Sequence, residues 1–147
     1  MAFAGAREFP EGTRTAADAA AAIGCEVAQI VKSLVFTRPR SAGAGTGSRG
    51  DDAVLVLCSG ANTVDEASLA VAKADAAFVR EATGFAIGGV PPYGWRTAPA
   101  ETLVDEDLLV HEVVWAAAGT PRSVFPLSPA ELVARSGGRV ARVSPAR

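Results

Sequence analysis

Alternating apolar and polar positions are clearest in the run QIVKSLVF, residues 29–36, where they predict a β-strand. One face of this strand would carry Ile30, Lys32, Leu34 and Phe36, and the other face Val31, Ser33 and Val35. Because both faces are mostly apolar, we expect a central strand. The exception is Lys32, since burying an unpaired ammonium group is costly.

A second apolar run, residues 53–60, predicts the strand that returns alongside the first. Between the two lies a stretch rich in Gly, Ser and Arg, residues 38–52, which we interpret as a long hairpin connection. It lacks the GK[ST] ending of a Walker A loop, so a phosphate-binding role receives little weight. Further strands are expected at residues 85–89, 102–110, 112–119 and 123–127, with an edge strand at residues 139–143.

Capping signals mark the expected helices. Thr15 followed by Asp18 predicts a helix start, and Gly24 predicts its end. Ser128, followed by proline and Glu131, is a second start of this kind. Two more helices are expected over residues 65–76 and 76–84. Helices and strands mix without a regular βαβ rhythm, which favours an α+β fold with a mixed, curved sheet.

Length and composition fit one domain over residues 1–147. An apolar fraction of 49% and a charged fraction of 20% are typical of a folded, soluble protein. No apolar run approaches the roughly 20 residues that a bilayer-spanning helix needs. The N-terminal residues 1–12 lack a basic region followed by an apolar core, so we expect no secretory signal and a cytoplasmic location.

Few residues are suited to metal binding or nucleophilic catalysis. Cys25 and Cys58 have no CxxC partner and no nearby histidine, and we interpret both as small residues of a reduced core. His111 is the single histidine, which removes most zinc sites and argues against a Ser-His-Asp triad. We therefore expect no metal and no cofactor.

The net charge of −2 argues against a protein dedicated to duplex DNA. The charges are unevenly distributed, because residues 101–112 form an acidic block and residues 113–147 contain five arginines and one acid. Two interpretations stay open: a local basic face for a nucleic acid end, or a solvated mixed surface.

The segment TGFAIGGVPPYGW, residues 83–95, holds four glycines and two prolines. Gly88 and Gly89 permit backbone conformations and close approaches that a Cβ atom would prevent. Pro91 and Pro92 stiffen the chain that follows and remove two amide donors. Such a loop either presents backbone N–H groups to a ligand or serves as a tight structural turn.

Two other segments carry polar residues at expected turns. Gly119 and Thr120 begin a turn between strands, after which Ser123 faces either a ligand or solvent. Asn62 is interpreted as a turn former and Asp65 as a helix cap.

Four segments, taken in order, carry a resemblance to a known family: QIVKSLVF, SGANTVDEASLA, TGFAIGGVPPYG and AAAGTPRSVFPLSPAELVARSGGRVARV. They resemble the YbaK family, the editing domain associated with prolyl-tRNA synthetase. The resemblance covers nearly the whole chain. Its specific feature is the combination of the lysine-bearing strand with the Gly-Gly-Val-Pro-Pro loop.

This resemblance implies a mixed α/β fold around a six- to seven-stranded, partly barrel-like sheet. It also implies a hydrolase that cleaves the ester between a wrongly attached amino acid and a tRNA, commonly the tRNA for proline. Lys32 matches the lysine of the family, and residues 88–92 match its GxxxP loop, which lies against the aminoacyl group. Lys32 would then point into a cleft and meet the negatively charged 3′ end of tRNA.

The resemblance also implies a set of site residues and partners. The catalytic residues would be Lys32, Gly88 and Gly89, and the substrate-binding residues Asn62, Val90, Pro91, Pro92, Trp95, Gly119, Thr120 and Ser123. The partners would be the 3′ end of an aminoacyl-tRNA and prolyl-tRNA synthetase, with no membrane and no DNA.

Two features depart from the family pattern. The loop over residues 38–52 is longer than that pattern needs, and Trp95 stands where relatives often carry histidine. Trp95 would either stack on the terminal adenine or form part of an apolar rim. No nucleophile–base pair is evident, and the resemblance points to a substrate-assisted hydrolysis. The stiff, apolar residues Val90, Pro91 and Pro92 predict a pocket for a small aminoacyl group, alanyl first and then cysteinyl or seryl. The alternatives are a non-catalytic module that binds aminoacyl-tRNA or a synthetase, and an unrelated small-molecule binder.

Overall fold

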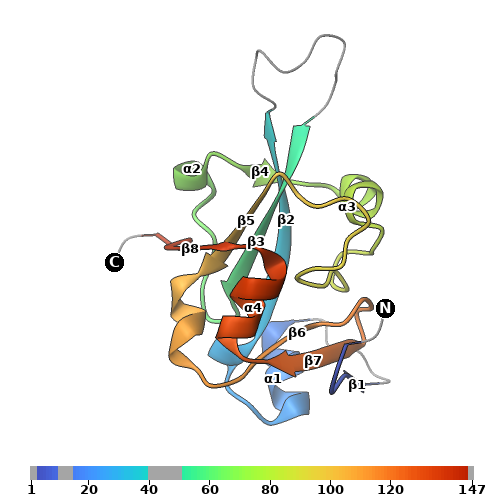
Figure 1. Cartoon of the computed structure of the whole chain (residues 1–147), viewed down its shortest axis with the longest axis vertical. Coiled ribbons are helices and arrows are strands. Elements are labelled where there is room, and N and C mark those ends of the chain that lie inside the picture. The colour runs from blue at the N-terminus through green and yellow to red at the C-terminus, as the bar shows by residue number, and fades with distance from the viewer. Residues whose placement is uncertain (1–2, 10–14, 40–50, 146–147) are drawn as a thin grey trace.

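Two β-sheets with four flanking α-helices make up the part of the chain that the computed structural model describes, residues 3–9, 15–39 and 51–145 (Figure 1). The larger sheet has the order β4-β2-β3-β5-β8, with bounds Ala72–Lys73, Val31–Pro39, Asp51–Ser59, Glu101–Asp105 and Arg139–Ala141. The smaller sheet has the order β1-β7-β6, with bounds Arg7–Glu8, Ser123–Leu127 and Val114–Ala117. The α-helices are α1 (Ala16–Ile23), α2 (Glu66–Leu69), α3 (Ala76–Thr83) and α4 (Pro129–Ser136).

The larger sheet is mixed. β2 and β3 pair antiparallel from Val31 opposite Ser59 to Pro39 opposite Asp51, while β3–β5 and β5–β8 pair in parallel. The smaller sheet is antiparallel and meets β2 through a parallel bridge between Ile30 and Trp115. The predicted α+β class with a mixed sheet is therefore confirmed, although the described strands do not close into a barrel.

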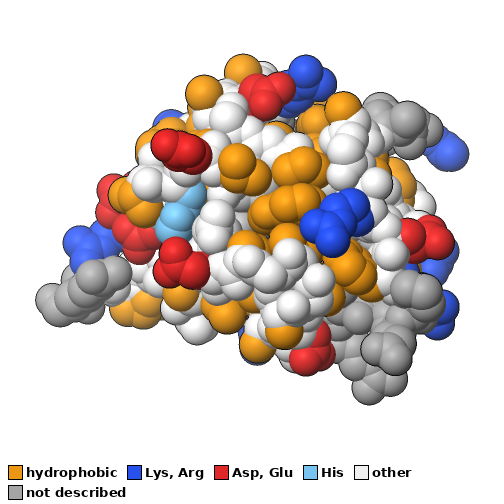
Figure 2. Space-filling model, turned by 90° about the horizontal axis from the view of Figure 1, so that it is seen from below, with side chains coloured by type: hydrophobic (Ala, Val, Ile, Leu, Met, Phe, Trp, Pro, Cys, Tyr) orange, Lys and Arg blue, Asp and Glu red, His pale blue; other side chains and the backbone are white. Residues whose placement is uncertain are grey.

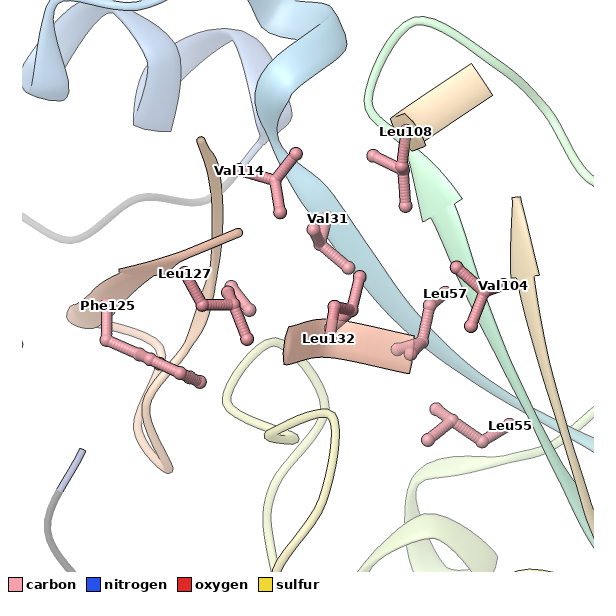
Figure 3. Packing of buried hydrophobic residues seen from close by; sticks show 10 residues of the cluster. Val31, Leu55, Leu57, Val104, Leu108, Val114, Phe125, Leu127 and Leu132 are labelled. Atoms are coloured by element: carbon pink, nitrogen blue, oxygen red, sulfur yellow. The ribbon is translucent and has the colours of Figure 1, made fainter. Parts of the chain in front are cut away.

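The hydrophobic core lies on both faces of the larger sheet. Alternation along β3 directs Leu55 and Leu57 to one face, where they pack with Leu132 of α4 and Phe125 of β7 (Figure 3). The opposite face carries a second cluster: Phe36, Val54, Val56, Cys58, Leu103, Val64 and Val143. β3 is thus the central strand. The expected central strand, β2, has β3 on one side but only the two-residue β4 on the other.

The predicted helix caps are confirmed. Thr15 accepts a hydrogen bond from the Asp18 N–H, and Gly24 ends α1 in the left-handed conformation. Ser128 and Glu131 form a reciprocal capping box at the start of α4.

Three predicted elements differ in the structure. The helix expected over residues 65–76 ends at Leu69, because Ala70 adopts a left-handed conformation with φ 56°. The strand expected at residues 85–89 is a turn closed by a hydrogen bond from Gly89 to Ala86. The strand expected over residues 102–110 changes after Asp105 into a 3-10 turn, Glu106–Val110, because the Asp105 side chain caps that turn.

The edges of the fold carry mixed surfaces. Seen from below, apolar side chains gather on the molecular surface with charged side chains among and around them (Figure 2). The guanidinium of Arg7 on β1 lies 5.4 Å from the ring centre of Phe9 and 5.6 Å from that of Trp115, which ties β1 to β6.

Within the described ranges, none of the helices has the length and apolar character needed to cross a bilayer. The interpretation of residues 38–52 as a hairpin connection is tested only at its ends, since residues 40–50 lie outside the described ranges.

Candidate active site

A mostly apolar cleft of about 790 Å³ opens between α1, β2, the chain after β3, the glycine-containing turn and the β6–β7 hairpin. Its volume lies within the range of small-molecule sites, about 300–1,000 Å³. The polar or charged side chains on its wall are Thr15, Lys32, Ser33, Thr63, Glu66, Lys73 and Ser123. Among the predicted site residues, the cleft brings together Lys32, Gly88, Val90 and Ser123.

Lys32 projects from β2 into this cleft and is partly buried. Its Nζ donates a hydrogen bond of 2.5 Å to the backbone carbonyl of Asn62. That carbonyl partner makes partial burial of the ammonium tolerable, because a buried charge requires a hydrogen-bonded environment. The lysine therefore presents a positive charge to the cleft from a fixed position.

The side chain of Asn62 is turned toward two carboxylates. Its Nδ2 donates to Asp105 at 2.9 Å and to Asp107 at 2.8 Å, and Asn62 does not line the cleft. Asp105, at the end of β5, also accepts from the backbone N–H of Ser59 at 2.9 Å. The expected turn at Asn62 is present, and its side chain is engaged inside the protein.

Lys32, Asp105 and Asp107 act electrostatically on the thiol of Cys58. Cys58 faces the same side of the sheet as Lys32, because the two residues are paired across β2 and β3. Burial raises the pKa of Cys58 to about 12, with Lys32 acting in the opposite direction and the carboxylates of Asp105 and Asp107 adding to the rise. Cys58 therefore stays protonated at neutral pH, and it is a core residue as expected.

The glycine-containing turn lies directly against the β6–β7 hairpin. A Cβ atom on Gly89 would stand 2.8 Å from backbone atoms of Thr120, so only glycine fits there. Gly88 lines the cleft with φ +91°, a conformation that favours glycine. The Gly89 N–H already donates to the Ala86 carbonyl at 2.9 Å, and of the two glycines only Gly88 is among the residues that line the cleft.

The residues after the turn support the cleft from behind. Pro91 and Pro92 are buried and are not among the lining residues, whereas Val90 is buried and lines the cleft. Trp95 packs partly buried against the core, and its Nε1 donates to the Pro91 carbonyl at 2.9 Å. In this arrangement Trp95 braces the loop and does not reach the cleft.

The predicted turn between β6 and β7 is present. Gly119 has φ +105° and lies against Phe85, and the hydroxyl groups of Thr120 and Ser123 are 2.8 Å apart. Ser123 lines the cleft, while Gly119 and Thr120 do not. Thr120 instead supplies the backbone against which Gly89 packs.

Comparison with known families identifies the family of this chain. The model of the aminoacyl-tRNA editing domain matches residues 10–134, which is most of the chain. The chain belongs to the aminoacyl-tRNA editing domain family. The resemblance drawn from the lysine-bearing strand and the glycine-proline loop is thereby confirmed.

Two solved structures are similar to nearly the whole of this chain, and a further relative is similar in sequence. The crystal structure of a proposed trans-editing enzyme for prolyl tRNA synthetase is 45% identical with a TM-score of 0.79, over 96% of this chain and 86% of that chain. The crystal structure of hypothetical protein APE2540 is 29% identical with a TM-score of 0.78, over 95% and 90% of the two chains. The uncharacterized protein YwhH of Bacillus subtilis (strain 168) is 30% identical over 136 residues, 85% of this chain and 76% of its own length.

Sequence reasoning missed several residues of the editing-domain cleft. Lys73 and Glu66 line it, so both lysines of the chain belong to its wall. Ser33 lines it as well, and its Oγ is buried without a hydrogen-bond partner among the described residues. Only the scarcity of lysine could have drawn attention to Lys73, because the pairing of β4 with β2 that brings it there is not local.

Proposed function

We propose that this editing domain is a trans-acting deacylase that hydrolyses the ester of a mischarged tRNA, most readily tRNA for proline that carries alanine. The observation that carries the proposal is the partly buried ammonium of Lys32 in a cleft that the Gly88 backbone also lines. An ester at the 3′ end of tRNA combines a polyanion with an aminoacyl group whose side chain is small and uncharged, and the cleft offers the ammonium groups of Lys32 and Lys73 and an apolar wall for these two parts.

Lys32 is suited to anchor the terminal phosphate or ribose. Its Nζ has three N–H donors, of which one is directed to Asn62. The remaining donors are available to the acceptor end, and a charge-assisted hydrogen bond is about twice as strong as a neutral one. Lys32 would thereby hold the acceptor end in the cleft that Gly88 also lines.

The backbone N–H of Gly88 is suited to stabilise the oxyanion that forms as water attacks the ester carbon. A preorganised donor at this point contributes to the rate because negative charge develops there only in the transition state. The bond from the carbonyl carbon to the ribose oxygen then breaks, which releases the free amino acid and the tRNA hydroxyl. Gly89 contributes by its close packing on Thr120, which sets the position of Gly88.

Attack by water requires little acid–base help from the protein. The described residues of the cleft wall include no histidine or cysteine, and His111 lies elsewhere. An aminoacyl ester is already reactive, and the neighbouring ribose hydroxyl can assist the water. Positioning of the reacting groups therefore accounts for the catalysis.

Substrate choice follows from exclusion by size. Val90 forms a buried part of the wall, and the buried Pro91 and Pro92 behind it limit how far the wall can yield. Steric exclusion of a larger group is sharper than rejection of a smaller one, where a methylene is worth about 1–3 kcal/mol. Alanyl ester should therefore react faster than prolyl ester.

A panel of alanyl-, seryl-, cysteinyl- and prolyl-tRNA tests the proposal. We expect amino acid release above the spontaneous rate, fastest for alanyl-tRNA, and its loss in Lys32→Ala. Protection of every ester from spontaneous hydrolysis would instead identify a binding module. Hydrolysis of prolyl-tRNA as fast as that of the smaller esters would overturn the size argument.

A further inference from the structure

Asp105 is a buried carboxylate for which the proposed mechanism has no direct use. It is 1% exposed and stands at the end of β5. Its oxygens accept from the N–H of Ser59 at 2.9 Å, from the Nδ2 of Asn62 at 2.9 Å and from the N–H of Asp107 at 2.9 Å. Such complete pairing fixes the carboxylate, because a buried charge is stable only with its acceptor positions occupied.

Asn62 connects this carboxylate to the cleft. Its amide group bridges Asp105 and Asp107, and its backbone N–H donates to Ser59 at 2.9 Å. The same residue receives the Lys32 ammonium on its carbonyl oxygen. Both the side chain and the backbone N–H of Asn62 are therefore held by hydrogen bonds. These bonds fix the orientation of the Asn62 carbonyl group.

We propose that Asp105 is a positioning residue that acts through Asn62 to hold the Lys32 ammonium in the cleft. A lysine side chain has high rotamer entropy, so an anchored acceptor increases the time that it spends in one geometry. The part of this proposal that concerns catalysis rests on the proposed deacylase function. The part that concerns the placement of Lys32 does not.

Amine labelling tests the placement directly, because the chain contains only two lysines, Lys32 and Lys73. The folded protein is treated with a lysine-acylating reagent at low concentration, and the labelling rate of each lysine is followed by peptide mass spectrometry. Lys73 is exposed on β4 and serves as the internal reference.

Two variants break the connection at different points. Asn62→Ala removes the amide bridge while keeping the carbonyl that accepts from Lys32. Asp105→Asn has nearly the same shape but places an N–H₂ group where one of three N–H donors was accepted, so at least one hydrogen bond is lost. Glu106→Gln is the matched control, since Glu106 lies between Asp105 and Asp107 in the sequence but is exposed.

We expect Asn62→Ala and Asp105→Asn to raise the labelling rate of Lys32 roughly tenfold, the effect of losing one hydrogen bond of average strength. The labelling rate of Lys73 should stay constant, and Glu106→Gln should match the wild type. An unchanged Lys32 rate in Asn62→Ala would overturn the proposal. So would a rise that Lys73 shares equally, because it would indicate general loosening of the fold.

A double-mutant cycle tests the catalytic part with alanyl-tRNA. If Asp105 acts through Lys32, Asp105→Asn lowers kcat/KM roughly tenfold in the wild-type background and has no further effect in the Lys32→Ala background. Additive losses would overturn the positioning role. Absence of any deacylation, together with faster labelling of Lys32, would contradict the proposed function while leaving the placement of Lys32 supported.

Discussion

At the scale of the residue, the lysine within an apolar strand is explained by what its two ends contact. Lys32 extends from β2, is partly buried, and its ammonium meets the carbonyl of Asn62 at the wall of a cleft. The strand therefore stays compatible with the core while it carries a charge. We therefore expect the charge of Lys32 to serve binding more than the stability of the fold.

Replacing Lys32 by alanine should abolish most of the deacylase activity and leave the fold intact. Losing a charge-assisted contact costs roughly one to three decades in rate. Turnover of alanyl-tRNA and the thermal midpoint are the measurements. Arg135→Ala is the charge-matched control, because Arg135 pairs with Glu131 on an exposed face of α4, where ion pairs contribute little. Full activity of a folded Lys32→Ala protein would refute the site assignment.

At the scale of the element, two glycines in one turn have different requirements. Gly89 lacks room for a side chain against the backbone of Thr120, whereas Gly88 has room but a left-handed φ. The turn and the β6–β7 hairpin thus determine each other's position. A side chain at either glycine should alter the cleft. At Gly89 it would clash with the backbone of Thr120, and at Gly88 it would strain the backbone.

Gly89→Ala is expected to lower both activity and thermal stability, since the backbone of Thr120 cannot yield cheaply. Gly88→Ala should cost about 1–2 kcal/mol of stability through left-handed strain and reduce activity. Gly84→Ala is the control, because Gly84 has φ +85° with open space around it and only caps α3. We expect its stability loss to resemble that of Gly88→Ala while kcat/KM stays at the wild-type value. Equal kcat/KM in all three variants would mean that the turn is a connector only.

Sequence patterns predicted the elements whose signals are local and missed those set by distant contacts. The helix caps at Thr15 and Ser128 depend on hydrogen bonds between residues three positions apart, and both predictions are confirmed. The end of α2 at Ala70 carries no Gly or Pro signal, since an alanine adopts the left-handed conformation there. Lys32 was found through its apolar surroundings and a family resemblance. Its anchor at Asn62 was not, because that contact requires β2 to pair with β3 across the intervening chain.

Glu101 links three strands of the larger sheet, and its ionisation makes the stability of the fold depend on pH. It pairs with Arg38 of β2 at 2.8 Å and with Arg139 of β8 at 3.1 Å, and hydrogen bonds from these arginines lower the pKa of its carboxyl group. A lowered pKa stabilises the fold above the unfolded value of about 4.3, and this contribution is lost as pH falls through the folded value. Because the pairs are partly exposed, the contribution should stay below about 1 kcal/mol.

Urea unfolding of the wild type and Glu101→Gln checks this dependence. We expect the wild type to be the more stable protein at neutral pH and the difference to shrink as the pH falls below about 4. A gap of the same size at both ends of this range would contradict the role of the Glu101 charge.

At the scale of the whole molecule, the buried centre of the larger sheet protects Cys58. The residue is 0% exposed on β3, its thiol has a pKa of about 12, and Cys25 is only partly buried on the chain after α1. Exposing Cys58 requires the central strand to open. Its reactivity should therefore report global unfolding.

Alkylation with iodoacetamide near pH 8 should modify Cys25 first and Cys58 at least ~100-fold more slowly. The rate at Cys58 should rise with urea in parallel with the loss of the folded signal. Rapid modification of Cys58 in the native protein would show that β3 opens locally.

The parallel pairing of β3 with β5 also has a consequence for the order of folding. The β2–β3 hairpin joins neighbouring segments, but β5 reaches β3 only after a long stretch of chain has closed into a loop. Closing long loops is slow relative to forming local contacts. Because Asp105 arrives with β5, we expect the contact that fixes Lys32 to form late. On the proposed deacylase function, ester hydrolysis by a newly made chain should therefore begin only after β5 has docked on β3.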